Sequence, residues 1–348
     1  MKKRLLSALV ALLLLCSLAP AASAVSFVDV PEKHWAYDDI VAASQVGLFQ
    51  GVTATHFGMG STITRAQFVT VLVRLFGWST VRPDTPSYSD CDTSRWYYAA
   101  VETAHANGAL PAYATTFRPN DPITREEMAS MLVRGLGYST LAGQLTSASL
   151  PFDDVTSNRG YIAMAYDLGI VGGYDDGTFR PRAVAAREEA AVMLMRVYRK
   201  LHAASTAVTA ESGYIPIAIS TPRPTAATSI PTTPLESMES LYSILRRYKE
   251  AGTDMSKVAL VLTAGGVATT TQGSKILSTE TVSAAAVRSY LASSGVRTYY
   301  SDQHQCGYLI LEDKETSLTL WYQTPESQAA KLRLCRLFGV EHYILQDM

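Results

Sequence analysis

Apolar residues recur at helical spacing in three consecutive segments of the N-terminal half. The segments begin at Phe27, Tyr88 and Phe152. Each predicts a first helix that ends at a glycine, a loop that closes on an aromatic residue, and a second helix with an apolar face. One such helix–loop–helix unit is too small to bury a core alone. We therefore expect the three units to pack together.

Helix-like and strand-like segments alternate from Leu235 onward. The expected helices cover 235–251, 281–293 and 325–338. The expected strands cover 257–263, 296–300, 307–311, 318–322 and 342–345. This order predicts a smaller α/β domain over 235–348 with some antiparallel hairpins. Before it, residues 202–234 are rich in Ala, Ser, Thr and Pro, which is typical of a linker. Tyr214 to Ile219 could still form a strand, and the domain would then begin near Gly213.

The first 24 residues resemble a secretory signal peptide. A basic start is followed by an apolar run from Leu5 to Leu18 and by the small-residue sequence Ala22-Ser23-Ala24. The alternative, an uncleaved membrane anchor, is disfavoured because a spanning helix needs about 20 apolar residues. No later segment is apolar enough to span a membrane, so we expect an exported chain without an integral membrane segment.

Charge and cysteine content exclude several classes of function. The chain has 30 basic and 31 acidic residues without blocks of like charge, so nucleic acid is not an expected partner. Three cysteines follow the signal peptide, which is too few for a disulfide framework. A single Cys306–Cys335 bridge could form. Alternatively, His304 and Cys306 could act together as a catalytic dyad or a metal-binding pair. We expect no metal and no cofactor.

The second helix of each unit opens with an arginine in a similar context. Thr64 with Gln67, and Thr124 with Glu127, form capping-box patterns. They place Arg65 and Arg125 at helix starts, and Arg187 takes this position in the third unit. Unpaired N–H groups and the helix dipole favour anions there, and a guanidinium can grip a carboxylate in two places. The alternative is that each arginine pairs with an acid between repeats.

The three units resemble S-layer homology domains, with Phe-x-Asp-Val, a Trp-containing helix, a glycine loop and an Ile-Thr-Arg-Ala-Glu helix start. The resemblance assigns repeats to 25–78, 86–139 and 150–201. It implies a mainly α, pseudo-threefold helical prism whose grooves bind a secondary cell-wall polysaccharide or peptidoglycan-associated glycan, often with pyruvate ketals. By position, the ligand-contacting residues would be Arg65, Arg125, Arg187, Asp29, Asp90, Asp153, Trp35, Trp96, Gly51 and Gly173. The implied location is the cell wall or cell surface.

The third repeat departs from this pattern. Ser157 stands where the tryptophan is expected, and Ala186 replaces the capping threonine, a loss usually worth about 1 kcal/mol. We therefore expect its groove to be weak or silent. An alternative role for Trp35 and Trp96 is to fill the core of the prism.

The end of the chain resembles the closing part of family 18 glycoside hydrolase barrels, with a Trp321-Tyr322 strand followed by a Ser-x-x-x-Lys helix. It would be a truncated remnant, because a full barrel takes about 250 residues. The catalytic Asp-x-x-Asp-x-Asp-x-Glu motif is absent, and glycoside cleavage needs a positioned acid. We expect a non-catalytic module on an anchored surface protein. An S-layer lattice subunit and a wall-bound glycoside hydrolase are the alternatives.

Overall fold

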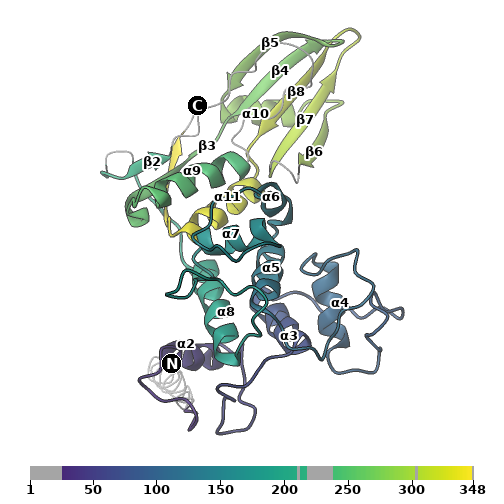
Figure 1. Ribbon diagram of the computed structural model, residues 1–348. Coiled ribbons are helices and arrows are strands. Elements are labelled where there is room, and N and C mark those ends of the chain that lie inside the picture. Colours follow the sequence, from purple (N-terminus) through teal and green to yellow (C-terminus); the bar gives the residue numbers. More distant parts are fainter. Residues whose placement is uncertain (1–25, 210–211, 218–237, 302–304, 347–348) are drawn as a thin grey trace, which may run out of the picture. The chain divides into compact units, whose positions relative to one another are not determined.

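The computed structural model describes residues 26–209, 212–217, 238–301 and 305–346 (Figure 1). The signal peptide expected over 1–24 and His304 of the suggested His304/Cys306 pair lie outside these residues. The described chain divides into two units. The first comprises residues 26–104, 114–123 and 184–195, and the second comprises 105–113, 124–183 and 196–346.

The N-terminal part is mainly helical, as the apolar periodicity predicts. The first repeat contributes α2 (Tyr37–Gln45) and α3 (Arg65–Phe76), and the second contributes α4 (Tyr98–Ala106) and α5 (Arg125–Gly135). After the short α6 (Ser139–Gln144), the third contributes α7 (Arg159–Asp167) and α8 (Arg187–His202). The apolar faces of these helices supply fully buried side chains such as Ile40, Phe68 and Ile162.

Three extended segments in the first unit form a closed set of backbone hydrogen bonds. Each segment lies just before the second helix of its repeat. Ile123 N–H donates to the carbonyl of Ile63 (3.0 Å), Ala185 N–H to that of Ile123 (2.9 Å), and Ile63 N–H to that of Ala185 (3.5 Å). All three residues are fully buried. The repeats therefore meet through main-chain bonds that return to their starting point.

The C-terminal part of the second unit contains two sheets. One is parallel, in the order β1-β9-β3-β2, and the other is antiparallel, in the order β5-β4-β8-β7-β6 (Figure 1). The parallel strands are β1 (Thr206–Ala207), β2 (Ile215–Ile217), β3 (Val258–Thr263) and β9 (His342–Gln346). The antiparallel strands are β4 (Gly266–Gln272), β5 (Lys275–Val282), β6 (Arg297–Ser301), β7 (Cys306–Glu312) and β8 (Ser317–Tyr322).

Helices α9 (Met238–Glu250) and α11 (Pro325–Phe338) pack against each other, and α10 (Ala284–Leu291) covers one face of the antiparallel sheet. A short 3-10 turn, Met255–Lys257, leads into β3. Strands β1 and β2 lie within the segment expected to be a linker, and both pair with strands of the α/β region. The sheet thus recruits chain that composition alone assigns to a spacer.

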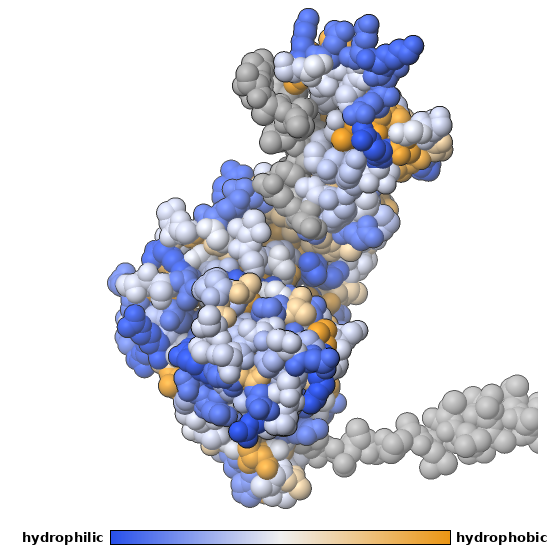
Figure 2. All heavy atoms as spheres, turned by 90° about the vertical axis from the view of Figure 1, so that its right-hand side faces the viewer, coloured by the Kyte–Doolittle hydropathy of each residue, from blue (hydrophilic) through white to orange (hydrophobic). Residues whose placement is uncertain are grey.

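The surface of the described residues is largely hydrophilic on the face drawn in Figure 2, where apolar residues occur in small groups. None of the described helices has the length and apolar character needed to cross a membrane. Cys91, Cys306 and Cys335 are buried free thiols, so the Cys306–Cys335 bridge considered from the sequence is not formed.

Candidate glycan-binding junctions between the repeats

Each repeat holds its own loop with one aspartate. The Asp29 carboxylate accepts hydrogen bonds from the N–H groups of Phe57 and Gly58, both at 2.8 Å, and of Met59 at 3.0 Å. Partial desolvation acts to raise the pKa of Asp29, but these donors outweigh it and the pKa is lowered. Asp90 does the same for the N–H groups of Phe117 (2.8 Å) and Arg118 (2.6 Å). The expected aspartates therefore shape the loop.

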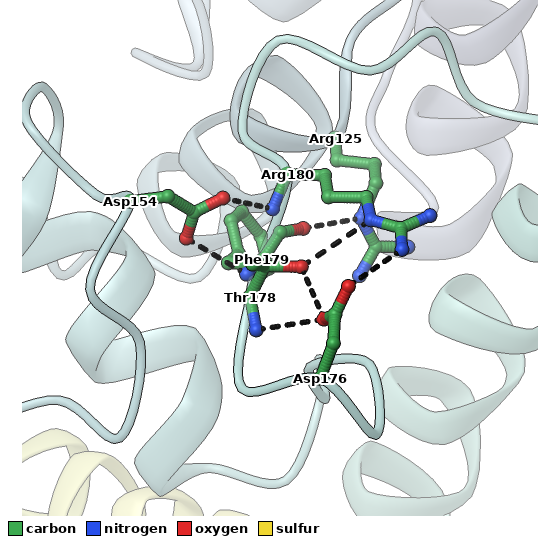
Figure 3. Close-up of polar contacts among 6 residues, drawn as sticks. All are labelled: Arg125, Asp154, Asp176, Thr178, Phe179 and Arg180. Atoms are coloured by element: carbon green, nitrogen blue, oxygen red, sulfur yellow. Dashed lines mark hydrogen bonds and ion pairs between the residues drawn. The ribbon is translucent and has the colours of Figure 1, made fainter.

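In the third repeat this role falls to Asp154, and the expectation for Asp153 is wrong. Asp154 accepts from the N–H groups of Phe179 at 2.8 Å and Arg180 at 2.7 Å (Figure 3), whereas Asp153 is exposed. Phe152-Asp153-Asp154-Val155 has two adjacent acids. The one that matches Asp29 in Phe27-Val28-Asp29-Val30 is the second.

The residue after the loop phenylalanine has a left-handed backbone in every repeat. It is Gly58 in the first (φ 88°), Arg118 in the second (φ 57°) and Arg180 in the third (φ 57°). This conformation costs a non-glycine residue roughly 1 kcal/mol. In the third repeat Nη2 of Arg180 also forms an ion pair with Oδ2 of Asp176 at 2.8 Å. The Cζ atom of Arg180 lies 4.0 Å from the ring centroid of Tyr174. The same N–H that the aspartate binds is thus presented by a constrained backbone.

Each motif arginine holds the loop of the following repeat. The Nε of Arg65 donates to the Phe117 carbonyl at 2.7 Å, that of Arg125 to Phe179 at 2.9 Å (Figure 3), and that of Arg187 to Phe57 at 2.8 Å. The third contact returns to the first repeat. We use "junction" for a motif arginine together with the loop it holds, and number the junctions 1 to 3 in the order Arg65, Arg125, Arg187.

Aromatic rings cover the guanidinium groups at all three junctions. Arg65 lies 4.8 Å from the centroid of Phe117, Arg125 lies 4.9 Å from that of Phe179, and Arg187 lies 5.0 Å from that of Phe57. Arg65 and Arg125 are buried, and Arg187 is half-buried. The ring contacts and the carbonyl hydrogen bond together hold each guanidinium group, and its positive charge, in a fixed place.

The helix-start N–H groups have other partners than the sequence suggested. The N–H of Arg65 donates to the carbonyl of Asp121, that of Arg125 to Ala183, and that of Arg187 to Ser61. The capping boxes of Thr64 and Thr124 are complete. Without a threonine, the third helix start keeps half the box, because Ala186 N–H donates to Glu189 at 2.8 Å. These N–H groups are therefore already hydrogen-bonded to the neighbouring loop and are not open donors for an anion.

The two tryptophans are at the surface, so the alternative that they fill the core is wrong. Trp35 is 60% exposed and Trp96 is 65% exposed. They precede α2 and α4, and each ring lies beside the ring of a neighbour in sequence, His34 and Tyr97 respectively. Exposed tryptophan on the rim of a repeat is free to stack on a flat apolar face of a ligand.

Gly51 and Gly173 are required by close packing. A Cβ on Gly173 would lie 2.2 Å from Cε1 of Phe152, and one on Gly51 would lie 2.3 Å from the Thr53 carbonyl oxygen. Both glycines therefore let a loop pass tightly over the start of its own repeat. A direct contact with ligand is not needed to explain either residue.

The junctions differ in the residue that follows the arginine. In junction 1 it is Ala66. In junction 2 it is Glu126, which accepts from the Ser157 hydroxyl at 2.7 Å, and in junction 3 it is Glu188, which accepts from Gly60 N–H at 3.0 Å. Ser157 occupies the position of the missing tryptophan. Sequence reasoning noted Ser157 but missed its bond to Glu126.

Several relatives match about half of this chain. An amylopullulanase of Thermoanaerobacterium thermosulfurigenes is 32% identical over 181 residues, which is 50% of this chain and 10% of the relative. An S-layer protein of Bacillus thuringiensis subsp. finitimus is 28% identical over 178 residues, 51% of this chain and 22% of the relative. The chain thus spans a small fraction of the curated relatives it matches.

Solved structures with a partial likeness include a GH18 chitinase from Cycas revoluta in complex with (GlcNAc)3. It is 13% identical, with a TM-score of 0.31 over 38% of this chain and 41% of that chain. The spore cortex-lytic enzyme SleL of Bacillus cereus is 16% identical, with a TM-score of 0.27 over 34% of this chain and 27% of that chain.

The family comparison covers all three repeats. The model that matches describes the S-layer homology domain, and it matches residues 26–69, 87–129 and 151–191. Together with the surface-layer relatives, this match confirms the expected cell-surface location. The segments that contain Arg65, Arg125 and Arg187 are therefore three S-layer homology domains.

Proposed function

We propose that the three S-layer homology domains anchor the chain non-covalently to the cell wall by binding an anionic secondary cell-wall polysaccharide. The observation that carries this proposal is the threefold recurrence of the junction, in which an arginine is fixed under aromatic rings beside a shaped loop. A pyruvate ketal on the polymer would supply the negative charge. The closed set of backbone bonds among the repeats supports a pseudo-threefold prism.

The residue types divide the work of binding. Trp35 and Trp96 offer exposed aromatic surface for a sugar ring, and the arginines supply positive charge from below the surface. The aspartates and glycines shape the loops that form the walls. Each motif arginine donates a hydrogen bond to a loop carbonyl, but its positive charge still attracts an anion nearby. This attraction needs no direct contact, and it is stronger in a partly desolvated site than in water.

Junction 1 is the strongest of the three candidate sites in this proposal. It lacks an acid directly after its arginine, since Ala66 stands there, and the repeat that supplies its loop carries Trp96. Junction 2 brings Glu126 to the position of the missing tryptophan, so an anion would meet a like charge there. Junction 3 combines Glu188 with Trp35 and is intermediate.

Co-sedimentation with purified walls tests the proposal. Wild-type protein should pellet with intact walls and stay soluble with walls stripped of secondary polysaccharide. A Trp35→Ala/Trp96→Ala variant should lose most of this binding at little cost in stability, because both rings are exposed. Tyr113→Ala is the matched control. Tyr113 is an aromatic residue that is 84% exposed, and it is not one of the proposed binding residues. Undiminished pelleting of the tryptophan variant, or equal pelleting with stripped walls, would overturn the proposal.

The α/β region is proposed to be a non-catalytic module. The whole sequence lacks the Asp-x-x-Asp-x-Asp-x-Glu motif that family 18 enzymes use, although a surface enzyme with another acid pair is a distinct hypothesis. Incubation of the mature chain with wall material or chitin oligomers should release no reducing sugar. Release that survives purification would identify a wall-bound hydrolase instead.

A lattice subunit is the second candidate, and the similarity to S-layer proteins favours it. In that case the repeats would anchor the chain while the α/β region packs laterally. Ordered arrays on isolated walls under the electron microscope would support this function, and a diffuse coat would count against it.

A further inference from the structure

The third repeat carries a buried carboxylate at a position where the other two repeats have no acid. Asp167 is the last residue of α7 and is 5% exposed. Counting back from the glycine that ends the first helix of each repeat, the equivalent residues are Gln45 and Ala106. A buried carboxylate is costly unless hydrogen bonds and charges compensate it. The partners of Asp167 therefore indicate what this surface is for.

The partners come from α9 of the C-terminal module. The hydroxyl of Tyr242 donates to Oδ2 of Asp167, and Nε of Arg246 lies 3.5 Å from the same oxygen. The ammonium of Lys249 donates to the main-chain carbonyls of Asp167 and Tyr166, at the end of α7. Residues 242, 246 and 249 lie on one face of a helix because they are spaced by four and three residues.

Asp167 and Tyr242 are withdrawn from water, whereas Arg246 is partly buried and Lys249 lies at the surface. Tyr242 is 1% exposed, and burial raises its pKa as well as that of Asp167, while the Tyr242 hydrogen bond and Arg246 act on Asp167 in the opposite direction. Lysine near the last carbonyls of a helix also interacts favourably with the helix dipole. The four side chains of Asp167, Tyr242, Arg246 and Lys249 are called the clamp below.

Further contacts join the same two parts of the second unit. The ammonium of Lys200, in the last turn of α8, donates to the Leu337 carbonyl of α11 at 2.7 Å. Nη2 of Arg246 donates to the Ser149 carbonyl at 2.7 Å, and Arg333 of α11 lies 5.8 Å from the ring centroid of Tyr138. Cations from each part thus bind main-chain carbonyls of the other.

We propose that the third repeat is the docking platform for the C-terminal module. The module, residues 206–346, is held against α7 by the clamp and does not swing on residues 203–205. The partner that this surface recognises is thus the chain's own α9, through a buried carboxylate and the carbonyl end of a helix. This role goes beyond wall anchoring, and it gives the third repeat a task that does not need a tryptophan.

A cleavable form of the full chain tests the dock without any wall material. A protease recognition sequence placed between Ala203 and Ala204, ahead of β1, would be cut after folding, and the two fragments would be followed by size-exclusion chromatography. With the wild-type clamp the fragments should elute together. With Tyr242→Phe/Arg246→Ala they should associate at least about ten-fold more weakly, the factor that corresponds to 1.4 kcal/mol.

The matched control is Arg247→Ala, since Arg247 is the exposed neighbour of Arg246 on the same helix. Circular dichroism of each uncut chain should show unchanged helix and strand content. Separation of the wild-type fragments on cutting would overturn the dock. Equal association of wild type and clamp variant would overturn the assignment of the clamp residues. Tyr242→Phe alone and Arg246→Ala alone complete a double-mutant cycle, in which additive losses would exclude a shared partner.

Discussion

Replacing Asp154 with alanine should destabilise the third repeat, whereas the same change at Asp153 should not. The Asp154 carboxylate accepts two backbone N–H groups, from Phe179 and Arg180, at 2.8 and 2.7 Å. Asp153 is its exposed neighbour. The two variants remove the same charge from adjacent positions, so their difference isolates the hydrogen bonds that close the loop.

The two bonds differ in how much their loss should cost. The N–H of Phe179 is part-buried, and a hydrogen bond to a charged group is worth about 1.5–3 kcal/mol when its partner is left unsatisfied. The N–H of Arg180 is exposed and water can replace the carboxylate, so its loss should cost about 0.5 kcal/mol. The left-handed conformation of Arg180 would also lose its restraint. We expect a total loss of roughly 2–3 kcal/mol for Asp154→Ala and less than about 0.5 kcal/mol for Asp153→Ala.

Thermal unfolding and hydrogen exchange together provide the assay. A loss of 2–3 kcal/mol should lower the midpoint by roughly 4–12 °C in a unit of this size. The amides of Phe179 and Arg180 should exchange faster in Asp154→Ala while those in the first repeat keep their protection. Equal effects of the two variants, or a larger effect of Asp153→Ala, would refute the assignment of Asp154 as the loop residue.

Three further predictions concern Asp29, Gly173 and two buried cysteines. Because the pKa of Asp29 is lowered in the folded state, its stabilisation is present above its ordinary pKa and is lost as the pH falls; the stability difference between wild type and Asp29→Asn should therefore shrink below about pH 4 in urea titrations. Gly173→Ala should lower the free energy of unfolding by roughly 1–3 kcal/mol, because the new Cβ would lie 2.2 Å from Cε1 of Phe152. Chemical denaturation measures this loss, and an unchanged midpoint would contradict that geometry. Cys306 and Cys335 should react with iodoacetamide only after unfolding, because burial raises the pKa of Cys306 to about 11 and that of Cys335 to about 12; mass spectrometry of the folded chain should find both unmodified.

The N-terminal half was largely predictable because its signals are local and repeated. A threonine three residues before Gln67 or Glu127 specifies a helix start with atoms that are close in sequence, and both capping boxes form. The arginine contacts were not predictable in the same way. Arg187 holds the Phe57 carbonyl, 130 residues away, and no sequence pattern states which loop a side chain will meet.

The errors have physical reasons. Asp153 and Asp154 are both acidic, and the spacing of Asp29 two residues after Phe27 in the first repeat points to Asp154, two residues after Phe152. Strands β4 and β5 were not expected because GVATTTQ and KILSTETV carry few apolar residues, although β-branched residues favour strands. Strand β2 was seen as an alternative, but its pairing with Val258 to Leu260 depends on chain more than 40 residues away.

The contact of Arg187 with Phe57 closes the set of three repeats. Each arginine reaches forward to the next loop, and the last one reaches back to the first, so every motif arginine has a loop carbonyl and every loop has an arginine. A shorter chain that ended after the second repeat would leave Arg125 without Phe179 and the Phe57 carbonyl without Arg187. A fourth repeat added after the third would compete with the first for Arg187, which already donates to the Phe57 carbonyl. The three repeats thus behave as one closed unit, and a change in their number would break at least one of these contacts.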